Sequence, residues 1–152
     1  MKLLDSAWLL AGIIALAVPR AFADDTARPV KLDRAQLEGK AFENRAAVVK
    51  QEQSERGPFT THDLEAFIDG ERKFEAGVYK AGANRYTISE PYGVDEFMYF
   101  LEGGVKLTSQ DGSVVEIHAG EAVIIPRAWR GVWDTDGYTK IYVIYSPEHA
   151  IE

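Results

Sequence analysis

The stretch from Asp95 to Pro126 constrains the fold more than any other part of this chain. It consists of short apolar runs separated by turn residues, and the clearest turn is Asp111-Gly112, a dipeptide typical of β-hairpins. None of these runs has the spacing of an amphipathic helix. Three or four short strands joined by turns predict an antiparallel all-β barrel or sandwich.

The strand pattern continues on both sides of this stretch. Upstream, apolar residues alternate with others from Phe74 to Val78, and a second strand is expected over residues 85–89. Downstream, strands are expected around Val132-Trp133 and from Tyr138 to Tyr145. Glycine-rich or polar segments predict turns or breaks between these strands, at residues 81–84, 103–104 and 134–137.

The segment before the strands is polar and is interpreted as a short N-terminal arm, residues 24–72. Its expected elements are a short helix from Asp33 to Leu37 capped by Asp33, a strand over residues 46–49, a loop over residues 52–58 and a helical turn over residues 63–68. We expect this arm to pack along the barrel or to reach a second subunit.

The first 23 residues have the pattern of a secretory signal peptide. Ala7 to Val18 is an apolar run too short to span a bilayer as a helix, and Ala21-Phe22-Ala23 is a cleavage signal. The n-region is atypical because Lys2 is its single basic residue, so an uncleaved anchor is the alternative. The expected division is signal peptide 1–23, arm 24–72, barrel 73–147 and tail 148–152, with the mature protein periplasmic or secreted.

Charge argues against two classes of partner. Removal of residues 1–23 takes away Lys2, Arg20 and Asp5, which leaves 15 basic and 23 acidic residues and a net charge of −8. An acidic surface without a basic stripe disfavours nucleic acid, and it also disfavours anionic membranes once the signal peptide is cleaved. The chain has no cysteine, so a disulfide framework is excluded.

Two spacings within the strand region match known motifs. Glu96 is followed after six residues by Gly103, and Gly120 is followed after five by Pro126. With the phrases DEFMYFLEGGVKLTSQDG, AGEAVIIP and RGVWDTDGYTKIYVIY, the chain resembles the RmlC-like cupin superfamily over about residues 74–145. Within it, the similarity is to the branch of (S)-ureidoglycine aminohydrolase and the ethanolamine-utilisation Q protein. The resemblance implies a single cupin, a double-stranded β-helix or jelly-roll barrel, and we expect a homodimer.

The resemblance also indicates where a metal would bind. Metal-binding cupins usually supply two histidines before the motif glutamate and a third after the second motif, a donor set suited to a divalent transition metal. Those positions here hold Glu90 and Tyr92, or Ser89 and Pro91 with a shift of one residue, and then Gly131. The usual three-histidine site is therefore absent and no cofactor is expected. Binding of a divalent metal stays an open alternative, with Glu96 and Glu90 as weak candidate ligands.

Glu96 is the sharpest candidate for a site residue. Strand alternation places it on the same face as Met98 and Phe100, and the resemblance directs that face into the barrel. A buried carboxylate is costly unless it is paired, and Lys140, which shares a face with Tyr142, is the candidate partner. The alternative is that both residues are solvated charges at strand ends.

Aromatic residues and one arginine complete the predicted site. The resemblance places Tyr79 and Trp133 at positions of pocket or wall aromatics, and Arg85 is a candidate anion clamp. The predicted ligand-binding residues are Glu96, Lys140, Tyr79, Tyr92, Trp133, Tyr142 and Arg85. We predict an exported cupin that binds a small polar or carboxylate-bearing metabolite. Two alternatives stay open: a small-molecule enzyme of the ureidoglycine-aminohydrolase-like type, and a non-catalytic structural or partner-binding cupin whose barrel is filled by side chains.

Overall fold

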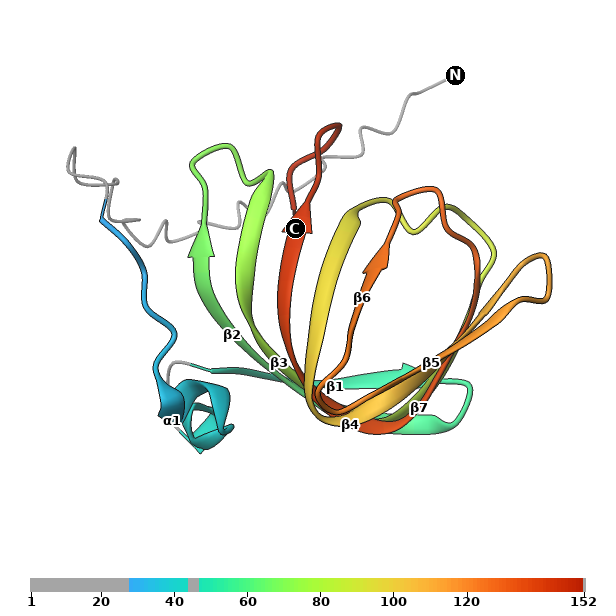
Figure 1. Ribbon diagram of the computed structural model, residues 1–152, viewed down its shortest axis with the longest axis horizontal. Coiled ribbons are helices and arrows are strands. Elements are labelled where there is room, and N and C mark those ends of the chain that lie inside the picture. The colour runs from blue at the N-terminus through green and yellow to red at the C-terminus, as the bar shows by residue number, and fades with distance from the viewer. Residues whose placement is uncertain (1–27, 44–46, 152) are drawn as a thin grey trace, which may run out of the picture.

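The computed structural model describes residues 28–43 and 47–151, and its dominant feature is one sheet of long, bent strands (Figure 1). The strands are β1 (Val48–Ser54), β2 (Gly57–Ile68), β3 (Phe74–Ile88), β4 (Asp95–Ser109), β5 (Val114–His118), β6 (Ala122–Ile125) and β7 (Gly131–Tyr145). Helix α1 (Arg34–Leu37) and the 3-10 helix η1 (Lys40–Glu43) precede them. The predicted signal peptide lies outside the described residues. Neither of the two described helices is long and apolar enough to cross a membrane.

The sheet is antiparallel throughout, with the order β1-β2-β3-β7-β4-β5 and with β6 also paired to β4. β5 pairs with residues 104–108 of β4, whereas β6 pairs with residues 96–99 of the same strand. The last strand, β7, lies at the centre, between β3 and β4 along almost its whole length. The predicted all-β jelly-roll barrel is confirmed.

The three predicted breaks are not strand ends. Residues 81–84, 103–104 and 134–137 lie inside β3, β4 and β7, so each pair of short predicted strands is one long strand. The register of β4 against β7 shifts on both sides of Gly103, which has a φ of 66° and whose Cβ would collide with the Gly137 carbonyl oxygen. Bulges bend a strand without ending it. Gly103 therefore marks a bend in β4, and the long strands are visibly bent in Figure 1.

The N-terminal segment divides into two parts. The short helix is confirmed, because the Asp33 side chain accepts a hydrogen bond from the Gln36 backbone N–H and the Gln36 side chain accepts one from the Asp33 N–H. The predicted loop over residues 52–58 and the helical turn over residues 63–68 are wrong. β1 begins at Val48, and β2 pairs with β1 on one side and β3 on the other. Pairing on both sides satisfies the backbone of β2 and overrides the helix-like spacing of its apolar residues.

The two faces of β4 show how the core is built. Met98 and Phe100 are fully buried inside the barrel and Glu96 lies on the same face, as strand alternation predicted. On the outer face, Phe97 is 41% exposed and Tyr99 is 37% exposed. The interior of the barrel is therefore lined by alternate residues of the long strands.

Candidate functional site

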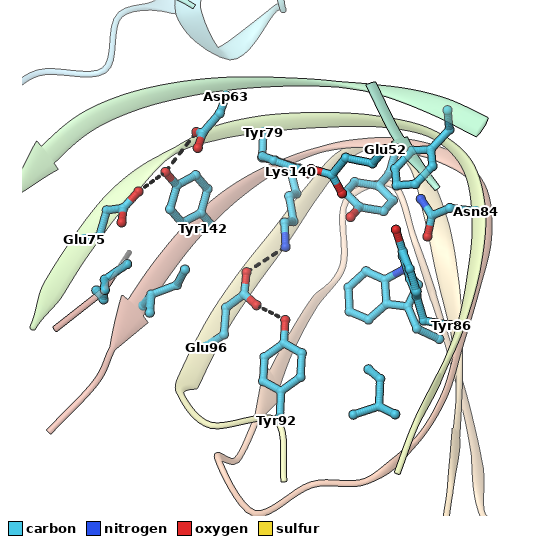
Figure 2. Close-up of a pocket in the computed structure, with 16 residues that line it drawn as sticks. Glu52, Asp63, Glu75, Tyr79, Asn84, Tyr86, Tyr92, Glu96, Lys140 and Tyr142 are labelled. Atoms are coloured by element: carbon cyan, nitrogen blue, oxygen red, sulfur yellow. Dashed lines mark hydrogen bonds and ion pairs between the residues drawn. The ribbon is translucent and has the colours of Figure 1, made fainter. Parts of the chain in front are cut away.

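A cavity of about 380 Å³ lies inside the barrel, against the inner faces of β2, β3, β4 and β7 (Figure 2). Seven of its lining residues are aromatic: Phe59, Tyr79, Tyr86, Tyr92, Trp133, Tyr138 and Tyr142. Five are charged: Glu52, Asp63, Glu75, Glu96 and Lys140. A cavity with mostly apolar walls and a few convergent polar groups is typical of a small-molecule site.

The first polar group in the cavity is the central ion pair, Glu96 and Lys140. The Lys140 Nζ donates to Glu96 Oε1 over 2.6 Å, and the two residues are only 6% and 3% exposed. The Tyr92 hydroxyl donates to Glu96 Oε2 over 2.5 Å, so both carboxylate oxygens accept a hydrogen bond. Glu96 and Lys140 are thus a buried, mutually satisfied pair and not solvated charges at strand ends.

Aromatic rings surround the lysine of this pair. The Lys140 Nζ lies 5.6 Å from the ring centroid of Tyr79, 5.4 Å from that of Trp133 and 5.5 Å from that of Tyr138. The negative face of an aromatic ring attracts a cation, and more strongly when water is excluded. The rings therefore help to stabilise an ammonium group in the interior. Burial raises the pKa of Tyr79 to about 12 and raises that of Tyr138 well above its usual value, so both hydroxyls stay protonated at neutral pH.

The second polar group is the acidic end, formed by Asp63, Glu75 and Tyr142. The Tyr142 hydroxyl lies 2.6 Å from Glu75 Oε1 and 3.0 Å from Asp63 Oδ1, with Asp63 on β2 and Glu75 on β3 (Figure 2). A phenol has one proton, so it donates to only one of the two carboxylates at a time. Burial raises the pKa of Asp63, and the negative charge of Glu75 adds to the effect, while the Tyr142 hydrogen bond opposes it.

Gly77 makes room for this arrangement. It is the register partner of Tyr142 in the neighbouring strand. A Cβ at this position would lie 2.8 Å from the Tyr142 hydroxyl and would collide with the Leu64 carbonyl oxygen on β2. The absence of a side chain at Gly77 therefore lets the Tyr142 ring reach across β3 to both carboxylates.

Six of the seven predicted ligand-binding residues line the cavity: Glu96, Lys140, Tyr79, Tyr92, Trp133 and Tyr142. Arg85 does not line it. Its guanidinium contacts Asp134 Oδ2 at 2.6 Å and Glu55 at 3.3 Å, because Arg85 and Asp134 are register partners on adjacent strands. An anion clamp at Arg85 is therefore not part of this cavity.

Several lining residues were not predicted, among them Glu52, Asp63, Glu75, Asn84 and Tyr138. Asp63 was missed because its segment was interpreted as a helical turn with Leu64, Phe67 and Ile68 on its inner side. Strand alternation could have identified Glu75, because it places this residue on the same face as Gly77 and Tyr79.

The residues at the usual metal positions do not fit a metal ion. Glu96 already meets an ammonium group and a phenol, Gly131 has no side chain, and Glu90 is exposed and does not line the cavity. In residues 28–43 and 47–151, no group of three or more His, Cys, Asp or Glu side chains is placed to hold a metal. The cation that the motif glutamate meets in this barrel is the ammonium of Lys140.

One family model and several solved structures are similar to this chain. A family model described as an EutQ-like cupin domain matches residues 69–142. A solved protein of unknown function from Pseudomonas syringae pv. tomato is similar to this chain, with a TM-score of 0.57 and 20% identity. The match covers 66% of this chain and 46% of the other protein, so it spans less than half of that protein's length. The EutQ protein of Clostridium difficile matches 59% of this chain and 71% of its own at 20% identity, with a TM-score of 0.46. The ectoine synthase of P. lautus matches 59% and 66% at 15% identity, with a TM-score of 0.48. No curated protein matches the chain.

Proposed function

We propose that the protein is an exported cupin that binds a small polar metabolite inside its barrel. The match of residues 69–142 to the model of an EutQ-like cupin domain supports the family. The observation that carries the proposal is the cavity of about 380 Å³ lined by rings and charged groups. This volume is within the range of small-molecule sites, roughly 300–1,000 Å³. It favours binding over the alternative of a barrel filled by its own side chains.

The enzyme alternative has weaker support. An aminohydrolase-like reaction at this site would need a group positioned to activate water or substrate. Both oxygens of Glu96 already accept hydrogen bonds, and the residues at the usual metal positions do not fit a metal ion. Binding of a small molecule is the function that this geometry supports best.

Occupying the cavity with a larger side chain tests the proposal. Ile144 lines the cavity on β7, and Ile144→Trp should fill its space and weaken binding of small molecules at least tenfold. The adjacent residue on the outer face, Val143, provides the matched control Val143→Trp. Binding is measured by calorimetry or ligand-observed NMR with a library of small metabolites of all charge classes. Equal binding by both variants and the wild type, or binding of no compound by the folded wild type, would contradict the proposal.

We also propose that the mature protein begins at Asp24 after export. The support is the sequence pattern of residues 1–23. N-terminal sequencing of the protein from the periplasm or medium should give Asp24 as the first residue. Recovery of the intact N-terminus from the membrane fraction would show that the apolar run is an anchor.

A second copy of the chain is the partner that we propose for the outer sheet face of β4 and β6. Phe97 and Ile124 are register partners there, and they are 41% and 68% exposed. Apolar patches on a sheet are commonly covered in an oligomer. Light scattering should give a dimer for the wild type and a monomer for Ile124→Lys, whereas a monomeric wild type would remove the support for this interface.

A further inference from the structure

Resting on the proposed binding function, we propose that the ligand is a small organic cation whose ammonium or guanidinium group binds beside Asp63 and Glu75, at the acidic end of the cavity. Neither the family match nor the similar structures assign a chemical class to the ligand.

The charge balance of the cavity is the first step. Four lining residues are acidic and one is basic, and the basic one, Lys140, is already bound to Glu96. The other three carboxylates, those of Glu52, Asp63 and Glu75, form no ion pair with another residue of the described part. An incoming cation would therefore meet an excess of negative charge, while an incoming carboxylate would meet repulsion.

Hydrogen-bonding capacity points in the same direction. Asp63 Oδ2 and Glu75 Oε2 accept no hydrogen bond from any described residue, because the Tyr142 hydroxyl contacts only the other oxygen of each group. Asn84, which is 2% exposed and lines the cavity, donates its Nδ2 to the Gly82 carbonyl oxygen over 2.8 Å. Its Oδ1 receives no donor from the described residues. These acceptor oxygens have no donor to bond with in the described part of the protein. An ammonium or guanidinium group supplies several N–H donors.

Free donors are fewer, and they suggest a second feature of the ligand. The indole N–H of Trp133 and the hydroxyl of Tyr138 line the cavity and have no hydrogen-bond partner in the described ranges, although these residues are only 5% and 8% exposed. Buried polar groups are normally paired, so these two are available to a ligand. A cation that also carries a neutral acceptor, such as a hydroxyl, could satisfy both kinds of group.

The aromatic walls favour the same charge. The rings of Tyr79 and Tyr142 meet edge to face with their centroids 6.5 Å apart, so Tyr79 lies next to the acidic end. Ring faces attract cations and repel anions, and three rings of this cavity already surround the ammonium of Lys140. This argues against the carboxylate-bearing form of the ligand that the sequence allowed. Burial raises the pKa of Asp63, and a cation bound beside it would lower that pKa again.

The test uses compounds that differ only in their charged group. Two hydrocarbon groups, n-butyl and phenethyl, are each tested as the ammonium, the alcohol and the carboxylate compound. Binding to the mature protein is measured by ligand-observed NMR and calorimetry. For at least one hydrocarbon group, the ammonium compound should bind about tenfold more tightly than the alcohol, and the carboxylate should show no binding. Asp63→Asn and Glu75→Gln should each weaken ammonium binding at least fivefold while leaving the alcohol unchanged.

Glu90→Gln is the matched control, since Glu90 is an exposed carboxylate that does not line the cavity. It should leave all affinities within twofold of the wild type. Alcohols or carboxylates that bind as tightly as the ammonium compounds would overturn the cation inference and leave the binding function in place. Binding of none of the compounds by folded protein would contradict the inference, and the Ile144→Trp comparison with the wider library would then decide the proposed function separately.

Discussion

The central ion pair and the acidic end lie in one cavity but differ in how their charges are satisfied. Glu96 has a lysine and a tyrosine as donors, one for each oxygen. Asp63 and Glu75 share the single proton of Tyr142. The first group is complete within the protein, whereas the second lacks donors. Burial of a charged residue therefore does not by itself mark a ligand site. The incompletely paired group is the better candidate for a ligand site, because a ligand can supply the hydrogen-bond donors that it lacks.

Breaking the central ion pair should have the largest effect. Lys140→Met leaves the Glu96 carboxylate buried without its cation, which should reduce the free energy of unfolding by about 3–5 kcal/mol. Glu96→Gln should also destabilise the protein. The double variant should cost less than the sum of the two changes, because removal of the first partner already breaks the interaction. Urea unfolding of the four proteins measures this, and strictly additive effects would show that the two residues are not coupled.

Removing a charge from the acidic end should have the opposite sign. The pKa of Asp63 is raised in the folded protein above the ordinary value of 3.8, chiefly by burial, with Glu75 and Glu65 adding and Tyr142 and Lys50 opposing. The stability associated with protonated Asp63 is fully present below the unfolded pKa and is lost as pH rises through the folded pKa. Asp63→Asn should therefore equal the wild type in stability below about pH 4 and exceed it at neutral pH, by about 0.5–2 kcal/mol.

Unfolding curves of both proteins across this pH range, without added ligand, check the prediction. A destabilised Asp63→Asn variant at neutral pH would show that Asp63 is well satisfied in the folded protein. The contrast between the two groups would then disappear, and with it the physical reason to expect a cation at the acidic end.

The smallest effect is expected outside the cavity, at Arg85. Its ion pairs with Asp134 and Glu55 are partly exposed, so solvent screens them. Arg85→Ala should lower the free energy of unfolding by at most about 1 kcal/mol. It should leave ligand affinity unchanged, because Arg85 does not line the cavity. A marked loss of affinity in this variant would restore Arg85 to the binding site.

Strand alternation together with the family resemblance predicted the all-β barrel and identified Glu96 and Lys140 as a candidate pair. Glu96 and Lys140 lie on strands whose faces can be counted, and the family resemblance directed the Glu96 face into the barrel. The acidic end could not be predicted in this way. Asp63 lies on a strand whose residues have helix-like spacing and which is held by pairing on both sides. Its proximity to Glu75 depends on the register between β2 and β3, including a shift between Glu65 and Phe67 that local residues do not specify.

The central position of β7 has a consequence for the order of folding. β7 follows both of its partners in the sequence, yet it separates β3 from β4 across the sheet. Until residues 131–145 are available, the facing edges of β3 and β4 have no partner, and unpaired edges are prone to association between chains. The barrel therefore cannot close progressively from its N-terminal end. Its closure is a late event that joins segments distant in sequence, and such topologies fold slowly.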